Sequence, residues 1–357
     1  MKITRTKLFI SKHIKYSLCF LLSIIQSLLW LSGLFELYLR LTKKNGAIIL
    51  MYHSITNSKN HCFIDPAYAM DINNFERQMK FLFKHRYVIS MDELSKQLAE
   101  GKTPKRGTVA ITFDDGYLDN YELAAPILKK YNLPATIYLA TGYVSRSEPQ
   151  WIDQLHWLFE IRTCHSLNLK ENNIYKNFDL GKKCELHRAY SVLVSQLIVS
   201  DQKARAALLS HIRNELKPSH EMPRTTLSWD EIKVMMGKYS NIEIGAHTNG
   251  HISLTTMDMK SIVEDISTCK REIESQLGYC PKHFSYPYGR TNPEVRSIVE
   301  SMNFKSAAVT DPASLIDINS DLFCLPRLNA PKSMSLFRAL TGGAIMPSIS
   351  QRLSCNI

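Results

Sequence analysis

The alternation of short apolar runs with amphipathic segments is the feature that most limits how this chain can fold. Beyond residue 44, runs rich in β-branched and apolar residues alternate with segments that show helical periodicity or a helix-capping pattern. This order is typical of βα units arranged around a parallel sheet, so we expect an α/β fold. The expected strands are residues 47–53, 109–113, 135–139, 242–246, 283–286 and 306–310.

Helices are expected where apolar residues recur at helical spacing or where a capping pattern occurs. Residues 74–84 place three large apolar side chains on one face, and residues 259–277 form a second, longer amphipathic segment. Ser90 and Ser228 are each followed three residues later by a glutamate, which is a pattern that starts helices. Amphipathic helices of this kind are the expected cover of the sheet.

The regular strand and helix order is interrupted once. Residues 152–226 are polar and mostly helical in pattern, so we interpret them as an insertion between two units of a barrel. The insertion belongs to a catalytic unit that spans residues 45–345, followed by a short tail at 346–357. No internal repeat or low-complexity tract is present in the sequence.

Residues 1–44 contain a candidate membrane anchor helix. The 20 residues at 16–35 carry no formal charge, which is about the length that a bilayer core requires. Five basic residues precede this run and three follow it before residue 45, which favours a cytoplasmic N-terminus and an outward-facing catalytic unit. No small-x-small cleavage site follows, so we expect a retained anchor rather than a removed signal peptide. A helix packed on the catalytic unit or lying in one leaflet would show the same pattern.

Composition excludes several broad classes. With 45% hydrophobic residues, 22% charged residues and only 14 Gly and 14 Pro, the chain is neither disordered nor collagen-like. The net charge is +11, but the basic residues beyond the N-terminus are scattered, so nucleic acid is not an expected partner. The eight cysteines include no CxxC pair and do not identify a redox compartment.

Two adjacent carboxylates follow one of the expected strands. The apolar run 109–113 leads directly into Asp114, Asp115 and Gly116. The C-terminal ends of parallel strands are where α/β folds place their catalytic groups. Adjacent side chains diverge, so one acid could bind a cation while the other handles a proton. A loop with a helix N-cap is the structural alternative, because Asp is favoured there.

Two histidines follow another expected strand. His247 and His251 are four residues apart, so a helical turn would bring both imidazoles within reach of one metal ion. Pairs with this spacing also occur by chance, and the pattern alone is weak. Combined with an acid pair at a second strand end, it becomes a candidate site with two histidines, one carboxylate and open coordination positions.

A third strand end is Tyr286-Pro287-Tyr288-Gly289. A turn of this kind can aim a backbone N–H into a pocket, where it could stabilise an oxyanion, although it can also be a turn and nothing more.

In this order, the three strand ends resemble the first three motifs of the polysaccharide deacetylases, the carbohydrate esterase group (family 4) that shares the NodB homology domain. Residues 49–55 also resemble the opening strand of the bacterial branch that acts on exopolysaccharides.

The resemblance covers about residues 47–330 apart from the insertion, and it implies a distorted (β/α)7-type barrel. It further implies that Asp115, His247 and His251 hold a divalent metal, most often zinc, and that Asp114 is the general base. A metal in an open site lowers the pKa of water and polarises a carbonyl, which suits hydrolysis of an N-acetyl group. The backbone N–H of Tyr288 would share the oxyanion.

The chain departs from the family pattern at two places. The third motif usually carries an arginine two residues before the proline, but this position is Ser285; Arg327 is our candidate for the missing cation, with a structural or surface ion pair as the alternative. The family's late histidine, its usual general acid, is also missing, because His283 is the last histidine of the chain. His53 is our substitute, with a packing role as the alternative, and His283 is less favoured.

Aromatic residues near the same strand ends are candidates for sugar contacts. We expect Trp151, Tyr286 and Pro287 to contact substrate, with Trp151 and Trp157 on one wall of a glycan groove. Apolar helix packing explains Trp157 equally well.

Taken together, the resemblance implies a hydrolase that removes N-acetyl groups from amino sugars of a bacterial surface polysaccharide or its lipid-linked precursor. We expect it at the inner membrane, anchored once, with other proteins of polysaccharide synthesis as partners. An O-acetyl esterase, another amide hydrolase or a glycan-binding protein without turnover are the alternatives. A non-haem iron oxygenase uses similar ligands, but the sequence shows no sign of an oxygen or 2-oxoglutarate pocket.

Overall fold

The structure is a computed structural model that describes residues 45–57, 63–146, 148–171, 174–310 and 315–343. The expected anchor helix at 16–35 and the tail at 346–357 lie outside these residues. Within the described part of the chain, no helix has the length and apolar character needed to cross a bilayer.

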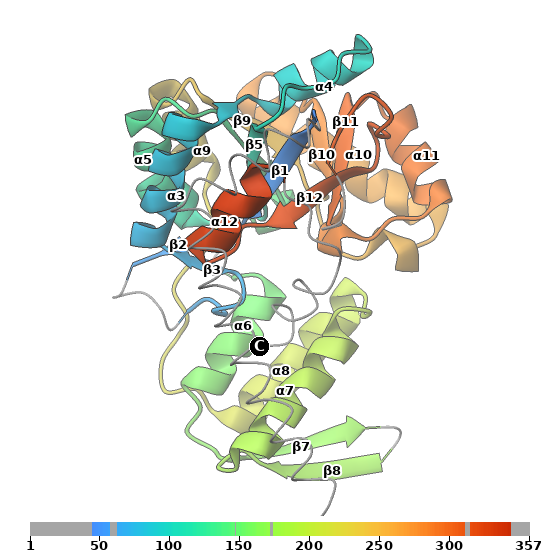
Figure 1. The fold of residues 1–357 in the computed structure, drawn as a ribbon. Helices are drawn as coiled ribbons and strands as arrows, with labels where there is room; N and C mark the ends of the chain where they lie inside the picture. Colours follow the sequence, from blue (N-terminus) through green and yellow to red (C-terminus); the bar gives the residue numbers. More distant parts are fainter. Residues whose placement is uncertain (1–44, 58–62, 147, 172–173, 311–314, 344–357) are drawn as a thin grey trace, which may run out of the picture.

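A closed barrel of seven parallel strands forms the centre of the molecule (Figure 1). β1 pairs with both β5 and β12, and this double pairing closes the ring in the order β1-β5-β6-β9-β10-β11-β12. The α/β prediction and the barrel of βα units are therefore confirmed. The strands of the ring are β1 (Ala47–Tyr52), β5 (Thr108–Phe113), β6 (Ala135–Leu139), β9 (Ile242–Ala246), β10 (His283–Ser285), β11 (Ser306–Thr310) and β12 (Leu325–Asn329).

Short strands accompany the barrel at its margin. β4 (Tyr87–Val88) pairs in parallel with the beginning of β5, and β2 (Ser54–Thr56) pairs with β3 (Ala69–Asp71) in a separate small sheet. β1 and β5 are buried along their whole length, which explains their continuous apolar sequences.

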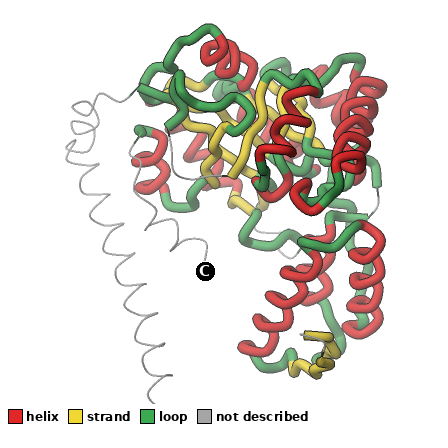
Figure 2. Tube along the Cα trace, turned by 90° about the vertical axis from the view of Figure 1, so that its right-hand side faces the viewer, coloured by secondary structure: helices red, strands yellow, loops and turns green. Residues whose placement is uncertain are grey.

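Helices surround the strands on the outside, as Figures 1 and 2 show. Both expected capping serines are N-caps: the Ser90 hydroxyl accepts a hydrogen bond from the backbone N–H of Glu93, and Ser228 forms a complete capping box with Glu231. The helices outside the insertion are α3 (Ile72–His85), α4 (Met91–Ala99), α5 (Ala125–Lys130), α9 (Trp229–Lys238), α10 (Met259–Leu277), α11 (Pro293–Ser301) and α12 (Met334–Thr341), with shorter turns at η1 (Asn120–Ala124), η2 (Thr141–Tyr143), η3 (Leu254–Thr256) and η4 (Pro287–Gly289).

The segment between β6 and β9 forms a separate layer beside the barrel, coloured green to yellow in Figure 1. It contains α6 (Trp151–Glu160), α7 (Lys183–Leu197) and α8 (Gln202–Leu216), together with an antiparallel hairpin of β7 (Ser166–Glu171) and β8 (Ile174–Asp179). The hairpin was not expected from the sequence. The layer has its own apolar core, built around buried Leu155, Trp157 and Leu193.

This layer contacts the end of the barrel where the strands finish, because Trp151 of α6 hydrogen-bonds to Tyr288 after β10 and Arg205 of α8 hydrogen-bonds to His251 after β9. The loops after β5, β9 and β10 meet at this end. They carry the acid pair, the two histidines and Tyr288, respectively.

Candidate active site

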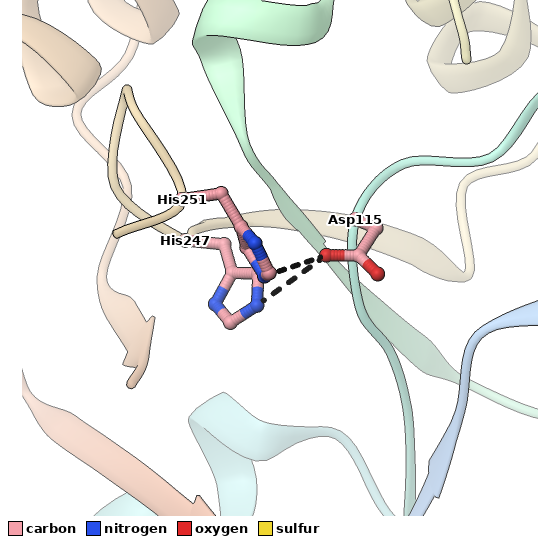
Figure 3. Close-up of side chains that lie close together, drawn as sticks. All are labelled: Asp115, His247 and His251. Atoms are coloured by element: carbon pink, nitrogen blue, oxygen red, sulfur yellow. Dashed lines mark ion pairs between the residues drawn. The ribbon is translucent and has the colours of Figure 1, made fainter. Parts of the chain in front are cut away.

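Three ionisable side chains from two loops converge at the C-terminal end of the barrel (Figure 3). Asp115 follows β5, whereas His247 and His251 follow β9. Asp115 Oδ1 lies 3.5 Å from His247 Nε2 and 3.2 Å from His251 Nε2. All three residues are buried, at 5%, 2% and 6% exposure. The three ligand atoms lie within 4.8 Å of one another, which is a spacing that one metal ion could bridge.

The backbone of these loops adopts conformations that side chains rarely accept. Asp115, Thr248 and His251 have positive φ angles of 76°, 67° and 48°, and Tyr288 in the neighbouring loop has 59°. Each such residue costs about 1–3 kcal/mol and persists only where its surroundings hold it in place. The concentration of these residues around one carboxylate indicates that the local chain path is set by the site.

The hydrogen bonding and the protonation state of the cluster favour binding of a cation. His247 Nδ1 lies 2.7 Å from the carbonyl oxygen of Ser285, so a proton on Nδ1 leaves the lone pair of Nε2 facing Asp115. Burial lowers the pKa of His247 to about 4, against the opposing effect of the nearby aspartates, so the ring is neutral at pH 7. Asp115 Oδ1 is buried and accepts no hydrogen bond from the described residues. A neutral imidazole and a carboxylate oxygen without a donor are what a divalent metal requires, and the residues present fit one.

Asp114, the neighbour of Asp115, is paired with an arginine from the last strand. Arg327 of β12 donates from Nη1 to Asp114 Oδ1 and from Nη2 to Oδ2, both at 2.6 Å. The arginine Nη2 also lies 2.7 Å from the hydroxyl of Ser285. Burial favours the neutral acid, but the charge and hydrogen bonds of Arg327 outweigh it and hold the pKa of Asp114 below its ordinary value. Asp114 is therefore ionised, oriented by a two-pronged contact and 3.9 Å from His247 Nε2.

His53 lies on the same side of the barrel, just after β1. Its ring contacts the ring of Tyr68 edge-on at 5.3 Å, and the residue is partly exposed. It is among the groups that lower the pKa of both Asp114 and Asp115, which places it near the pair. The carbonyl oxygen of His53 accepts a hydrogen bond from Asn120 Nδ2 at 2.8 Å.

His283, the other histidine considered as a proton donor, lies at the beginning of β10 rather than at its end. Its Nδ1 contacts the Ser306 hydroxyl at 2.9 Å, and its Nε2 lies 3.8 Å from Asp92 in the first turn of α4. It therefore belongs to the opposite end of the barrel and has no place in the site.

Comparison with known proteins identifies the family to which the chain belongs. The family profile described as "Polysaccharide deacetylase" matches residues 101–163 and 166–307, which is more than half of the chain. The chain belongs to the polysaccharide deacetylase family. Its acid pair and its histidine pair both follow strands of the barrel, and Arg327 pairs with the first acid, Asp114.

The chain is similar over part of its length to two proteins that are named as deacetylases. It is 41% identical to YxkH of Bacillus subtilis over 92 residues, covering 26% of this chain and 30% of that one. It is 32% identical over 153 residues to a Staphylococcus aureus protein named poly-beta-1,6-N-acetyl-D-glucosamine N-deacetylase, covering 37% of this chain and 52% of that one. The chain thus spans between about a third and about half of the length of these relatives.

Solved structures of the family share the fold. The deacetylase PplD of Streptococcus pyogenes, in complex with acetate, superposes with a TM-score of 0.54 at 19% identity, covering 85% of this chain and 99% of that one. IcaB from Ammonifex degensii gives a TM-score of 0.53 at 18% identity, covering 84% and 98%. At these identities the likeness concerns the fold alone.

The three residues expected to contact substrate are buried. Tyr286 is buried in the main apolar core of the molecule, and its hydroxyl donates to the carbonyl oxygen of Phe323 at 3.0 Å. Pro287 is buried beside it. Trp151 is 3% exposed, and its Nε1 donates to the hydroxyl of Tyr288 at 2.9 Å. These placements argue against the sugar contacts that we expected, because neither aromatic ring presents a free face.

The loop after β10 is fixed by a glycine. Gly289 has φ of 64°, and a Cβ atom there would approach the backbone nitrogen of Thr310 in β11 to 2.4 Å. Only glycine fits such an approach. Tyr288, immediately before it, is thereby held with its ring 4.9 Å from that of His251.

Sequence reasoning missed two supports of the histidine loop. Asp265 of α10 accepts hydrogen bonds from the backbone N–H groups of Asn249 and Gly250, both at 2.8 Å, and so fixes the turn between the two histidines. Arg205 of α8 reaches the carbonyl oxygen of His251. No local motif marks either residue, because each contact depends on how a distant helix packs.

Proposed function

We propose that this chain is a metal-dependent hydrolase that removes N-acetyl groups from amino sugars of a bacterial surface polysaccharide or its lipid-linked precursor. One observation carries the proposal: a buried cluster with the ligands for a divalent metal stands directly beside an ionised, arginine-held carboxylate. Metal ligands and a base at adjacent positions are the two elements that hydrolysis of an unreactive amide requires. The match to the deacetylase family supports the same reaction.

The metal ligands are Asp115, His247 and His251, and we propose zinc as the metal because two imidazoles and one carboxylate are typical zinc ligands. When bound, the metal supplies Lewis-acid chemistry: it lowers the pKa of water and polarises the acetyl carbonyl. The remaining chemistry belongs to side chains and backbone groups of this chain.

Asp114 is the general base. Its carboxylate lies on the metal side of the barrel, 3.9 Å from a metal-ligating imidazole, and is positioned to take a proton from the attacking water. Arg327 keeps the carboxylate ionised and fixes its orientation through two hydrogen bonds. Without that orientation, the proton would have to move to a carboxylate free to rotate away from the water.

Attack of water on the carbonyl places negative charge on its oxygen. The backbone N–H of Tyr288 is our candidate donor for this oxyanion, and one such donor is worth about 3 kcal/mol. Tyr288 is suited to the role because its side chain is fixed by Trp151 and His251, so its backbone cannot move freely. His53, partly exposed and near both aspartates, would then protonate the departing amine.

The proposed location of the protein is the inner membrane. Residues 16–35 would anchor the enzyme once in the inner membrane with the barrel facing outward, beside other proteins of polysaccharide synthesis. An N-acetylated polymer or glycolipid made at that membrane would be its substrate. The Staphylococcus aureus relative, named as an N-deacetylase of a β-1,6-linked N-acetylglucosamine polymer, supports this substrate class.

The test is acetate release by the full chain from β-1,6-linked N-acetylglucosamine oligomers and from an O-acetylated glycan, with and without a chelator. We expect release from the N-acetylated substrate only, abolished by the chelator and restored by Zn²⁺. Asp114→Asn is the control, because it should keep the metal and lose about 100-fold or more of the turnover. Release from the O-acetylated glycan alone would make the chain an esterase, and Zn²⁺ binding without any release would make it a binding protein.

A further inference from the structure

The two metal-ligating histidines are held in different ways. His247 is fixed through its own ring, because Nδ1 contacts the carbonyl oxygen of Ser285 at 2.7 Å. His251 Nδ1, in contrast, is buried and has no hydrogen-bond partner among the described residues. His251 also has a φ of 48°, a strained conformation that its surroundings must maintain. Some other contact must therefore hold this ligand in place.

That contact comes from the insertion. Arg205 lies in the first turns of α8, is 3% exposed, and donates from Nη1 to the carbonyl oxygen of His251 at 3.4 Å. Its Nε and Nη2 donate to the carbonyl oxygens of Leu197 and Ser200, at 3.1 and 3.4 Å, where α7 ends. One guanidinium thus joins the end of α7 to the backbone of a metal ligand on the barrel.

Two aromatic side chains complete the same connection. The guanidinium of Arg205 stands 5.3 Å from the ring centre of Trp151, which is a cation–π distance. Trp151 Nε1 donates to the hydroxyl of Tyr288, and that hydroxyl donates to the carbonyl oxygen of His251 at 3.1 Å. The Tyr288 ring also packs edge-on against the His251 imidazole.

The carbonyl oxygen of His251 therefore accepts two hydrogen bonds, one from Arg205 and one from Tyr288, and both donors contact Trp151. Partners beyond the ligands fix ligand orientation in metal sites, and their loss typically weakens metal affinity by about 10- to 100-fold. Here the partner acts on the backbone of the ligand rather than on its ring.

We propose that Arg205 is a positioning residue for the metal ligand His251, and that the insertion sets the geometry of the metal centre through the contacts of Arg205, Trp151 and Tyr288. This inference rests on the proposed metal dependence. It assigns to residues 151–216 a role in the chemistry of the barrel.

The test compares two arginines of the same helix. Arg213, also in α8, stands over Trp157 at the same 5.3 Å as Arg205 over Trp151, but it pairs with Glu221 on the outside of the insertion. Arg205→Met and Arg213→Met therefore each remove a cation–π contact from α8, and only the first removes a donor to His251. The Kd for Zn²⁺ is measured by competition with a chromogenic chelator, and the visible absorption of bound Co²⁺ reports the ligand geometry.

We expect Arg205→Met to weaken Zn²⁺ binding about tenfold and to alter the Co²⁺ absorption, with Arg213→Met within twofold of the parent. Equal affinity in Arg205→Met and the parent, or an equal loss in both variants, would overturn the inference. A parent chain that binds no Zn²⁺ would instead refute the metal dependence on which the inference rests.

Trp151→Phe covers the case in which Arg205→Met does not fold. Phenylalanine keeps an aromatic ring against Arg205 but removes the Nε1–H that fixes the Tyr288 hydroxyl. The same direction of change in Zn²⁺ affinity and Co²⁺ absorption is expected, and an unchanged Trp151→Phe protein would count against the connection.

Discussion

The strongest test of how Asp114 is held in place exchanges Ser285 and Arg327. In this chain the arginine that pairs with Asp114 comes from β12, and Ser285 occupies the position where the family usually carries arginine. The Ser285 hydroxyl lies 2.7 Å from Arg327 Nη2 and 3.4 Å from Asp114 Oδ2, so a side chain at 285 starts beside both charges. The single variant Arg327→Ser removes the cation, and the double variant Ser285→Arg/Arg327→Ser returns it from β10.

The size of the effect follows from burial. The side chains of Arg327 and Asp114 are 0% and 4% exposed, and their two contacts are charge-assisted hydrogen bonds. Removing one partner of a buried pair leaves an uncompensated charge and costs about 3–5 kcal/mol. Arg296→Ser on α11 is the matched control: it breaks an arginine–aspartate contact of 2.7 Å whose side chains are 33% and 44% exposed, worth at most about 1 kcal/mol.

The effect should also depend on pH. In the parent, pairing lowers the pKa of Asp114, so its contribution to stability is present above the unfolded value of about 4 and is lost below it. In Arg327→Ser, burial without a partner raises the same pKa above about 4. The variant therefore regains stability relative to the parent as pH falls from 7, because the buried acid becomes protonated.

Urea unfolding of the parent and the three variants at pH 7 and pH 5 measures these differences. We expect Arg327→Ser to lose about 3–5 kcal/mol at pH 7 and less at pH 5, with turnover down by about 100-fold. The double variant should recover about 2 kcal/mol or more, since the cation again faces the carboxylate. The reasoning is refuted if Arg327→Ser loses no more stability than Arg296→Ser, or if its loss is the same at both pH values.

Three further predictions concern single residues. Asp115→Ala should abolish Zn²⁺ binding, because it removes the carboxylate that both histidines face; a Kd close to that of the parent would exclude Asp115 as a ligand. His53→Gln should lower turnover by about 100-fold at unchanged Zn²⁺ affinity, and unchanged kinetics would return His53 to a packing role. Hydrogen bonds from Lys305 and Lys282 lower the pKa of Asp92 to about 2. Asp92→Asn should therefore destabilise the protein by up to about 1 kcal/mol above pH 4, with the difference disappearing as pH falls towards 2, and a loss that does not vary with pH would contradict this.

The barrel was largely predictable because most of its strands are short runs rich in apolar and β-branched residues. β6, β9 and β11 have the bounds expected from the sequence, and α10 begins and ends where expected. β12 was not among the expected strands, because a proline and a buried arginine interrupt its apolar pattern. Proline lacks a backbone donor and signals a break in a strand, although here the strand pairs on both sides.

The insertion shows where local patterns fail. Leu167 and Leu169 alternate with polar residues, which is a strand pattern, yet it lies within a segment whose other signals are helical. The direction of side chains could not be predicted either. Trp151 is a residue type that we expected to contact sugar, but its ring is enclosed by Arg205 and Tyr288. Such contacts depend on the placement of helices far apart in the chain, which no short motif encodes.

The candidate metal ligands were easier to predict, for a geometric reason. Parallel strands of one barrel finish at the same end, so polar residues that follow separate strands meet in space. The acid pair and the two histidines needed no knowledge of helix packing to be brought together, and the family resemblance singled out Asp115 from the acid pair.

The late position of β12 in the sequence has a consequence for synthesis of the protein. The guanidinium that holds Asp114 arrives on β12, more than 200 residues after the carboxylate itself. A nascent chain that has already emerged with both histidines still lacks the cation, and the ring of strands that buries Asp114 is still open. The ion pair that orients Asp114 therefore forms only when the ring of strands is complete, so a chain that ends before β12 cannot hold this carboxylate in place.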